Sequence, residues 1–163
     1  MSVVGLEDAS LPYARVKLEG ERLVRSSAVS WSVVRAMPFY YLLKRILNGL
    51  RWLPLWPVPK AVFNPVDTSD VANYLAKCAF DGSRGVRDEI GGPEDLICEE
   101  FARRYQEARG LKRALIPVRM SAKTARGMGL CVTKDARGSV SWASWLRSRR
   151  AFGRRSRIEK PPS

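Results

Sequence analysis

Tyr13 and Lys17 stand four residues apart near the start of the chain. In a helix, residues at this spacing lie one turn apart on the same face. A free phenol has a pKa of about 10, and an ammonium held close to it favours the phenolate, so that proton exchange becomes easier near neutral pH. A lysine also carries three donors for the hydroxyls of a bound sugar. The alternative is an ordinary helix face with a snorkelling lysine.

The composition excludes several other kinds of catalysis. The chain has 163 residues, of which 45% are hydrophobic, and this is enough for one domain with a core. It contains no histidine, which rules out Ser-His-Asp and Cys-His catalysis and the usual histidine-based metal sites. Cys78, Cys98 and Cys131 are widely spaced, which predicts reduced thiols in a cytoplasmic protein and no metal site. No secretion signal or membrane span is expected.

Strand and helix patterns alternate along the chain and predict a parallel α/β sheet with crossover helices. The apolar positions Val16, Gly20, Leu23 and Val24 recur at helical spacing and are expected to face inward. Strands are predicted at residues 2–5, which would sit inside the sheet, and at 31–35, 62–66, 86–90 and 114–117. Helices are predicted at residues 13–27, 38–48, 67–80, 95–109, 121–129 and 139–147, with a loop at 51–59.

Five short segments carry a family resemblance through their order. They are Met1–Gly5, Tyr13–Lys17, Trp31–Phe39, Asn64–Ala72 and Glu89–Glu94. Over residues 1–146 the series resembles the C-terminal half of an atypical short-chain dehydrogenase/reductase of the NmrA-like, NAD(P)-binding group. The resemblance implies half of a doubly wound, Rossmann-like parallel sheet with flanking helices, and NADP or NAD as the cofactor of intact relatives.

The glycine-rich turn that holds a dinucleotide pyrophosphate has no counterpart in the sequence. Gly91–Pro93 contains a proline, which removes an amide donor, and Gly127–Gly129 lacks a third glycine. We therefore expect a truncated oxidoreductase with weak or no activity, and weak or no NAD(P) binding by this chain alone. A genuine short protein, a mis-called start and a decayed gene all remain open. The alternative function is a non-catalytic module that senses a nucleotide or binds a partner.

The resemblance also implies which residues would act. Tyr13 and Lys17 would be the acid and its activating cation, Lys17 would also contact the cofactor ribose, and Ser2 would bind a substrate carbonyl. The turn after the second strand would line the nicotinamide side of the cofactor. Its residues are Ala36, Met37, Pro38 and Phe39, of which Pro38 and Phe39 are better ligand contacts than Arg35.

Aromatic residues downstream of this turn are candidates for a substrate pocket. Tyr40, Tyr41, Trp52 and Trp56 would wall an apolar pocket for a small-molecule substrate, and core packing is the equal alternative. Asp67 and Asp70 are interpreted as helix-capping residues rather than catalysts.

The net charge of +13 is concentrated in part at the C-terminus. Residues 147–163 contain seven basic residues and one acidic residue, which predicts a disordered basic tail. Contact with nucleic acid or anionic membranes is one interpretation, and a solvated tail with nonspecific polyanion affinity is the favoured one. A half sheet would leave strand edge and apolar surface open, so self-association is expected.

Overall fold

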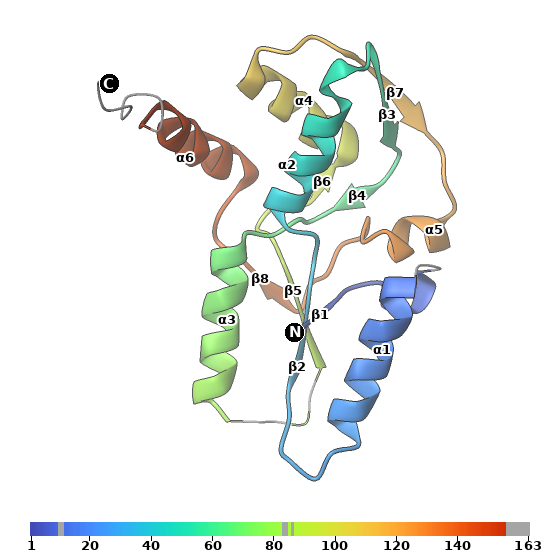
Figure 1. Ribbon diagram of the computed structural model, residues 1–163, viewed down its shortest axis with the longest axis vertical. Helices are drawn as coiled ribbons and strands as arrows, with labels where there is room; N and C mark the ends of the chain where they lie inside the picture. Colours follow the sequence, from blue (N-terminus) through green and yellow to red (C-terminus); the bar gives the residue numbers. More distant parts are fainter. Residues whose placement is uncertain (10–11, 83–84, 86, 156–163) are drawn as a thin grey trace, which may run out of the picture.

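The computed structural model describes residues 1–9, 12–82, 85 and 87–155. Its centre is a parallel sheet with the strand order β1-β2-β5-β8. Helices α1 and α3 lie on opposite faces of this sheet (Figure 1). The elements are β1 (Ser2–Val3), α1 (Pro12–Arg25), β2 (Val33–Ala36), α3 (Thr68–Phe80), β5 (Arg87–Gly91) and β8 (Ala136–Arg137).

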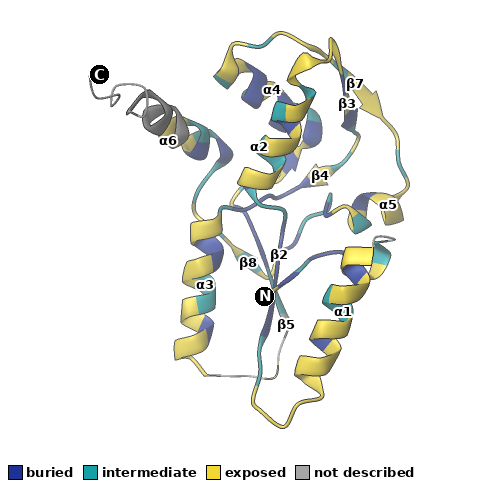
Figure 2. Cartoon of the chain, in the orientation of Figure 1, coloured by how far each residue is buried: buried dark blue, intermediate teal, exposed yellow. Residues whose placement is uncertain are grey.

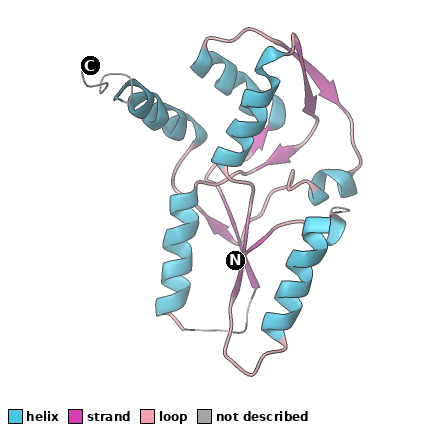
Figure 3. Ribbon diagram, viewed as in Figure 1, coloured by secondary structure: helices cyan, strands magenta, loops and turns pink. Residues whose placement is uncertain are grey.

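The remaining elements gather beyond the carboxyl ends of these strands (Figure 3). Here β3 pairs with β7 in parallel and β4 pairs with β6 antiparallel. These elements are η1 (Leu6–Asp8), α2 (Tyr40–Gly49), η2 (Leu50–Trp52), β3 (Leu55–Pro59), β4 (Val62–Phe63), β6 (Leu96–Ile97), α4 (Cys98–Arg109), β7 (Ala114–Val118), α5 (Ala122–Gly127) and α6 (Trp142–Arg155).

The predicted α/β class with a parallel sheet and flanking helices is confirmed, and the corrections concern single elements. Residues 55–59 form a strand, although the prolines of this segment predicted a loop; β3 is stabilised by β7, which lies far along the chain. The short strands β6 and β8 were not predicted. In the part of the chain that the structure describes, β1 pairs only with β2, so it forms an edge of the sheet rather than an interior strand.

The orientation of α1 differs from the predicted one. Val16, Leu23 and Val24 are exposed, and the buried residues of the helix are Ala14 and Glu21. The buried face therefore includes a carboxylate, which the apolar periodicity did not predict. The reason is an ion pair between this carboxylate and the sheet, described below.

Helix α6 extends to Arg155 and so enters the segment for which the composition predicted disorder. Arginine and alanine are good helix formers, and the basic charge of a segment does not by itself exclude a helix. Residues 156–163, the rest of the predicted tail, lie outside the described residues.

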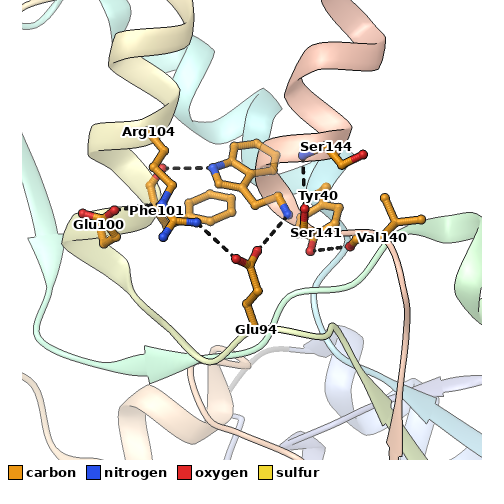
Figure 4. Close-up of polar contacts among 9 residues, drawn as sticks. Tyr40, Glu94, Glu100, Phe101, Arg104, Val140, Ser141 and Ser144 are labelled. Atoms are coloured by element: carbon orange, nitrogen blue, oxygen red, sulfur yellow. Dashed lines mark hydrogen bonds and ion pairs between the residues drawn. The ribbon is translucent and has the colours of Figure 1, made fainter.

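Aromatic packing fixes α4 and α6 against the start of α2. The rings of Phe101 and Trp142 stack with their centroids 4.2 Å apart, and Tyr40 lies 5.2 Å from Trp142. Glu94 joins the two helices, because it accepts from the Trp142 backbone N–H at 3.1 Å and from Arg104 Nη1 at 3.3 Å (Figure 4). This cluster belongs to the buried core shown in Figure 2.

Gly92 follows β5 and lies against the segment before α3. Its N–H donates to the carbonyl oxygen of Asn64 at 2.9 Å. A Cβ at this position would collide with the backbone carbonyl of Pro65 and would come within 3.3 Å of Tyr40 Oη. The backbone oxygen has no freedom to rotate away, so the position requires glycine.

We predict that Gly92→Ala lowers the free energy of unfolding by ~1–3 kcal/mol, because an inserted methyl group overpacks a rigid site. Gly20→Ala is the matched control: Gly20 lies inside α1 with no atom within 4 Å of its would-be Cβ. That change should raise stability by ~0.5–1 kcal/mol through helix propensity. Urea denaturation of both variants measures the two effects, and equal stability of the two would contradict the packing argument.

Candidate functional site

A cavity of about 330 Å³ lies where β1 and β2 end. Ligands bind at the carboxyl ends of strands in open parallel sheets. Three segments that are distant in the sequence line it: the N-terminal strand with α1, the turn between β2 and α2, and the residues that end α5. The lining residues are Met1, Ser2, Val3, Val4, Leu6, Ala9, Tyr13, Ala14, Lys17, Ala36, Met37, Pro38, Phe39, Leu42, Gly127, Met128 and Gly129.

Tyr13 and Lys17 project into this cavity from successive turns of α1. The Lys17 ammonium nitrogen lies 5.7 Å from the centroid of the Tyr13 ring, within the range of a cation–π contact. Tyr13 is 56% exposed, so part of the residue remains accessible. The helix thus places the ammonium over the ring of the tyrosine, and the catalytic role of the pair stays a prediction.

Ser2 contributes a buried hydroxyl to the cavity lining. The residue is only 3% exposed, and its Oγ has no hydrogen-bond partner among the described residues. An unsatisfied buried hydroxyl costs about 1–3 kcal/mol, and such groups call for an explanation such as a water molecule or a ligand. The serine that the resemblance singles out is therefore a polar group that lacks a protein partner.

The turn from Ala36 to Phe39 is held rigidly by its backbone. The Ala36 carbonyl accepts from Val4 N–H at 3.2 Å, and Met37 N–H donates to the Ile90 carbonyl at 2.9 Å. These bonds join β1, β2 and β5 at the rim of the cavity. The four residues predicted to contact a cofactor thus form one preorganised wall.

The third wall, Gly127–Gly129, was not predicted as part of the site. Gly129 has a φ of 71°, and a Cβ there would press against the Pro38 ring at 2.7 Å. This glycine therefore lets the chain pass close to the turn after β2. The Gly-Met-Gly sequence does not join a strand to a helix, as a dinucleotide-binding loop would; it lies at the end of α5. Only the tertiary structure brings it to the cavity.

Arg35 lies outside the cavity and anchors α1 to the sheet. Its guanidinium donates to Glu21 through Nε at 2.8 Å and Nη2 at 2.7 Å, and to Glu7 through Nη1 at 2.6 Å. Burial alone would lower the pKa of this guanidinium, but the two carboxylates outweigh it and raise the pKa. A bidentate contact of this kind fixes the orientation of both partners. Arg35 therefore positions the helix that carries Tyr13 and Lys17.

The four aromatic residues proposed for a substrate pocket do not lie together. Tyr40 and Trp56 are buried in the core, whereas Tyr41 and Trp52 are exposed. Tyr40 donates its hydroxyl to the Val140 carbonyl at 2.9 Å (Figure 4). Burial, with Glu94 nearby, raises its pKa, so it remains a neutral donor. None of the four lines the cavity beside Tyr13.

Of the two aspartates interpreted as helix caps, Asp67 caps α3, whereas Asp70 bonds to a distant segment instead. Asp67 is the N-cap of α3 and accepts from the Ser69 N–H at 3.2 Å. Asp70 is buried and accepts from Ser139 Oγ at 2.9 Å and from Val140 N–H at 3.0 Å. Both carboxylates are therefore occupied by structural hydrogen bonds.

The cysteines show no sign of thiolate chemistry. All three are free, and burial raises the pKa of the Cys98 thiol to about 11. Burial likewise raises the pKa of Cys131. Among the described residues no cluster of three or more potential metal ligands occurs, and no helix is long and apolar enough to cross a membrane.

The sequence matches no protein-family model and no curated protein sequence. The fold does match solved structures. One is the dTDP-glucose 4,6-dehydratase of Bacillus anthracis in complex with NAD, with a TM-score of 0.64 and 11% identity over 97% of this chain and 62% of that one. Another is the NADPH-dependent quinone oxidoreductase of Escherichia coli complexed with NADPH, with a TM-score of 0.64 and 13% identity over 90% and 63%.

A nucleoside-diphosphate-sugar epimerase of Staphylococcus aureus gives a TM-score of 0.53 at 20% identity, covering 91% of this chain and 51% of that one. The chain thus spans between half and two thirds of the length of each of these proteins. The fold of this chain is thus shared with part of each of these proteins and is a Rossmann-like parallel α/β fold.

We predict that Glu21→Ala lowers the free energy of unfolding by ~3 kcal/mol, because it leaves the buried Arg35 charge with only the half-exposed Glu7. Glu19→Ala is the matched control on the same helix: Glu19 pairs with Arg22 at the surface, and its loss should hardly change stability. Thermal and urea unfolding compare the two variants. A Glu21 variant as stable as the Glu19 variant would show that the ion pair does not anchor α1.

Proposed function

We propose that this chain is the tyrosine–lysine half of an NAD(P)-dependent oxidoreductase of the short-chain dehydrogenase type, with weak or no activity by itself. The observation that carries the proposal is the single cavity that collects Ser2, Tyr13, Lys17 and the turn from Ala36 to Phe39. These residues come from separate segments, and each was assigned to catalysis or cofactor contact by the motif order alone.

The residues suit one end of a nicotinamide cofactor together with a carbonyl substrate. A volume of about 330 Å³ lies at the small end of the range of ligand sites, ~300–1,000 Å³. The unpartnered Ser2 hydroxyl supplies a donor for a carbonyl oxygen. The nicotinamide, when bound, would supply or accept the hydride.

In this proposal the phenol of Tyr13 donates its proton to the carbonyl oxygen of the substrate as that oxygen gains negative charge. Lys17 stabilises the resulting phenolate and donates to the ribose hydroxyls. Ser2 orients the carbonyl, while Met37, Pro38 and Phe39 exclude water from one side. A non-catalytic sensing or partner-binding module would use the same cavity without the proton transfer.

The structure offers less support for a site that would bind the pyrophosphate of the cofactor. Helices α3 and α4 carry acidic residues in their first turns, Asp70 in α3 and Glu99 with Glu100 in α4. These negative charges oppose anion binding at a helix N-terminus. The expectation of weak cofactor binding by this chain rests on the lack of a glycine-rich turn.

We predict that the 163-residue chain binds NADPH and NADH weakly, with dissociation constants above ~100 µM, because the sequence offers no glycine-rich turn for the pyrophosphate. Isothermal titration calorimetry with each dinucleotide measures this. Low-micromolar affinity, equivalent to about −8 kcal/mol, would contradict the proposal.

We also predict the behaviour of a chimera in which the glycine-rich half of one of the structural neighbours precedes β1. If it reduces a carbonyl substrate, Tyr13→Phe should lower kcat by ~10²-fold or more with folding preserved, because only the acidic hydroxyl is removed. Lys17→Ala should weaken both turnover and cofactor affinity. Tyr41→Phe, an exposed tyrosine outside the cavity, is the matched control and should leave kcat unchanged. Full activity of Tyr13→Phe would favour the sensing or partner-binding alternative.

A further inference from the structure

The small sheet formed by β3 and β7 has two chemically different faces. Its parallel register places Leu55 beside Ala114, Pro57 beside Ile116 and Pro59 beside Val118. Alternate residues of a strand point to opposite faces, so these three pairs share one face. The other face carries Trp56 and Val58, which are buried; the Trp56 ring lies 6.3 Å from the ring of Tyr105 in α4.

The face with the three pairs is apolar and open. Leu55 is 52% exposed, Ile116 44% and Val118 39%. Trp52, which precedes β3, is 78% exposed. Strand β7 runs along the rim of the molecule and is exposed over most of its length (Figures 1 and 2). Adjacent apolar residues left open in this way are a candidate for a binding surface. We refer to Leu55, Pro57, Pro59, Ala114, Ile116 and Val118 as the outer face.

Basic residues flank the outer face at both ends. At the start of the strands, Arg113 Nη2 donates to the Arg51 carbonyl at 3.3 Å; at their end, the Lys60 N–H donates to the Val118 carbonyl at 2.8 Å, with Arg119 next in sequence. No aspartate or glutamate occurs in residues 22–66 or 108–134, which include both strands. A partner that offers apolar contact together with negative charge would complement this surface.

We infer that the outer face docks onto an anionic lipid bilayer. Arg51, Arg113, Lys60 and Arg119, here called the basic rim, would contact the lipid headgroups, and each charge would contribute ~1 kcal/mol near an anionic surface. The outer face would enter the boundary between the headgroups and the acyl chains. The guanidinium carbon of Arg51 lies 4.5 Å from the centroid of the Trp52 ring. Tryptophan is enriched at membrane interfaces.

The backbone disfavours a protein that would add a strand to this sheet. Pro57 and Pro59 in β3 and Pro117 in β7 lack N–H donors. Prolines on edge strands protect them from pairing with another chain. A bilayer needs no backbone hydrogen bonds and tolerates a flat surface. This docking is independent of the proposed oxidoreductase function, since none of the outer-face residues lines the cavity beside Tyr13.

Vesicle co-sedimentation of the full chain tests the inference. We expect binding at least ~10-fold stronger to phosphatidylcholine vesicles with roughly a third phosphatidylglycerol than to pure phosphatidylcholine, because the rim charges need an anionic surface. Raising the salt concentration should weaken the binding. Equal affinity for both kinds of vesicle, or no binding to either, would overturn the inference.

Two sets of variants separate the outer face from the rest of the chain. Leu55→Glu with Ile116→Glu should lower the affinity for anionic vesicles by ~10-fold or more, since both charges would enter the apolar boundary. Val16→Glu with Leu23→Glu on the exposed side of α1 introduces the same charges elsewhere and is the matched control. The basic residues of 147–163 are present in every variant, so any difference reports the outer face. Equal losses in the two pairs would overturn the inference.

The contribution of the basic rim can be tested with substitutions of exposed residues, which leave the core unchanged. Lys60→Gln with Arg119→Gln should also weaken vesicle binding several-fold, whereas Arg15→Gln with Lys134→Gln, which removes two exposed charges elsewhere, should have a smaller effect. Circular dichroism confirms folding in each case. If sedimentation equilibrium shows a dimer that Ile116→Glu dissociates, the outer face is an interface between two copies, and the membrane inference is wrong.

Discussion

The buried ion pair between Arg35 and Glu21 is the interaction on which the candidate site depends. Helix α1 carries Tyr13 and Lys17, yet its buried residues are only Ala14 and Glu21. An apolar face would hold a helix on a sheet without fixing its rotation closely. The bidentate contact between guanidinium and carboxylate is directional, and it sets which side of the helix faces β2. Tyr13 and Lys17 reach the cavity because Glu21, farther along the same helix, is tied to the sheet.

The cavity itself results from the parallel arrangement of the strands. Strands β1 and β2 run in the same direction and end side by side, so the chain must leave both at the same rim. The turn from Ala36 to Phe39 is bonded there to β1 and β5, and Gly129 allows the end of α5 to close the third side. The polar groups in this enclosure are few, and Ser2 is the one that lacks a partner in the described structure.

A second group of elements supports the site from beyond the strand ends. The aromatic residues Tyr40, Phe101 and Trp142 pack α2, α4 and α6 together, which holds the start of α2 directly after the cavity wall. The same group includes β3 and β7, whose inner side completes the core with Trp56. Their outer side remains apolar and is bordered by basic residues. One small sheet therefore serves packing on one face and presents a binding surface on the other.

The sequence alone determined the class of the fold, because alternating strand and helix patterns with short connections leave few arrangements besides a parallel sheet. The order of motifs also singled out Ser2, Tyr13, Lys17 and Ala36 to Phe39, and these residues line one cavity in the structure. Local signals were sufficient for the Asp67 cap and for the end of α4 at Gly110, whose left-handed conformation suits glycine.

Only the tertiary structure decided the features that depend on distant partners. The apolar spacing of Val16, Leu23 and Val24 predicted an inward face, but the pairing of Glu21 with Arg35 turned that face outward. Residues 55–59 became a strand because β7 lies beside them, and the same distant packing buried Tyr40 and Trp56 while leaving Tyr41 and Trp52 exposed. Gly127–Gly129 joined the site for the same reason. Periodicity records what each segment prefers locally, whereas a buried charge or a strand pair is stabilised only by a residue that the fold brings to it.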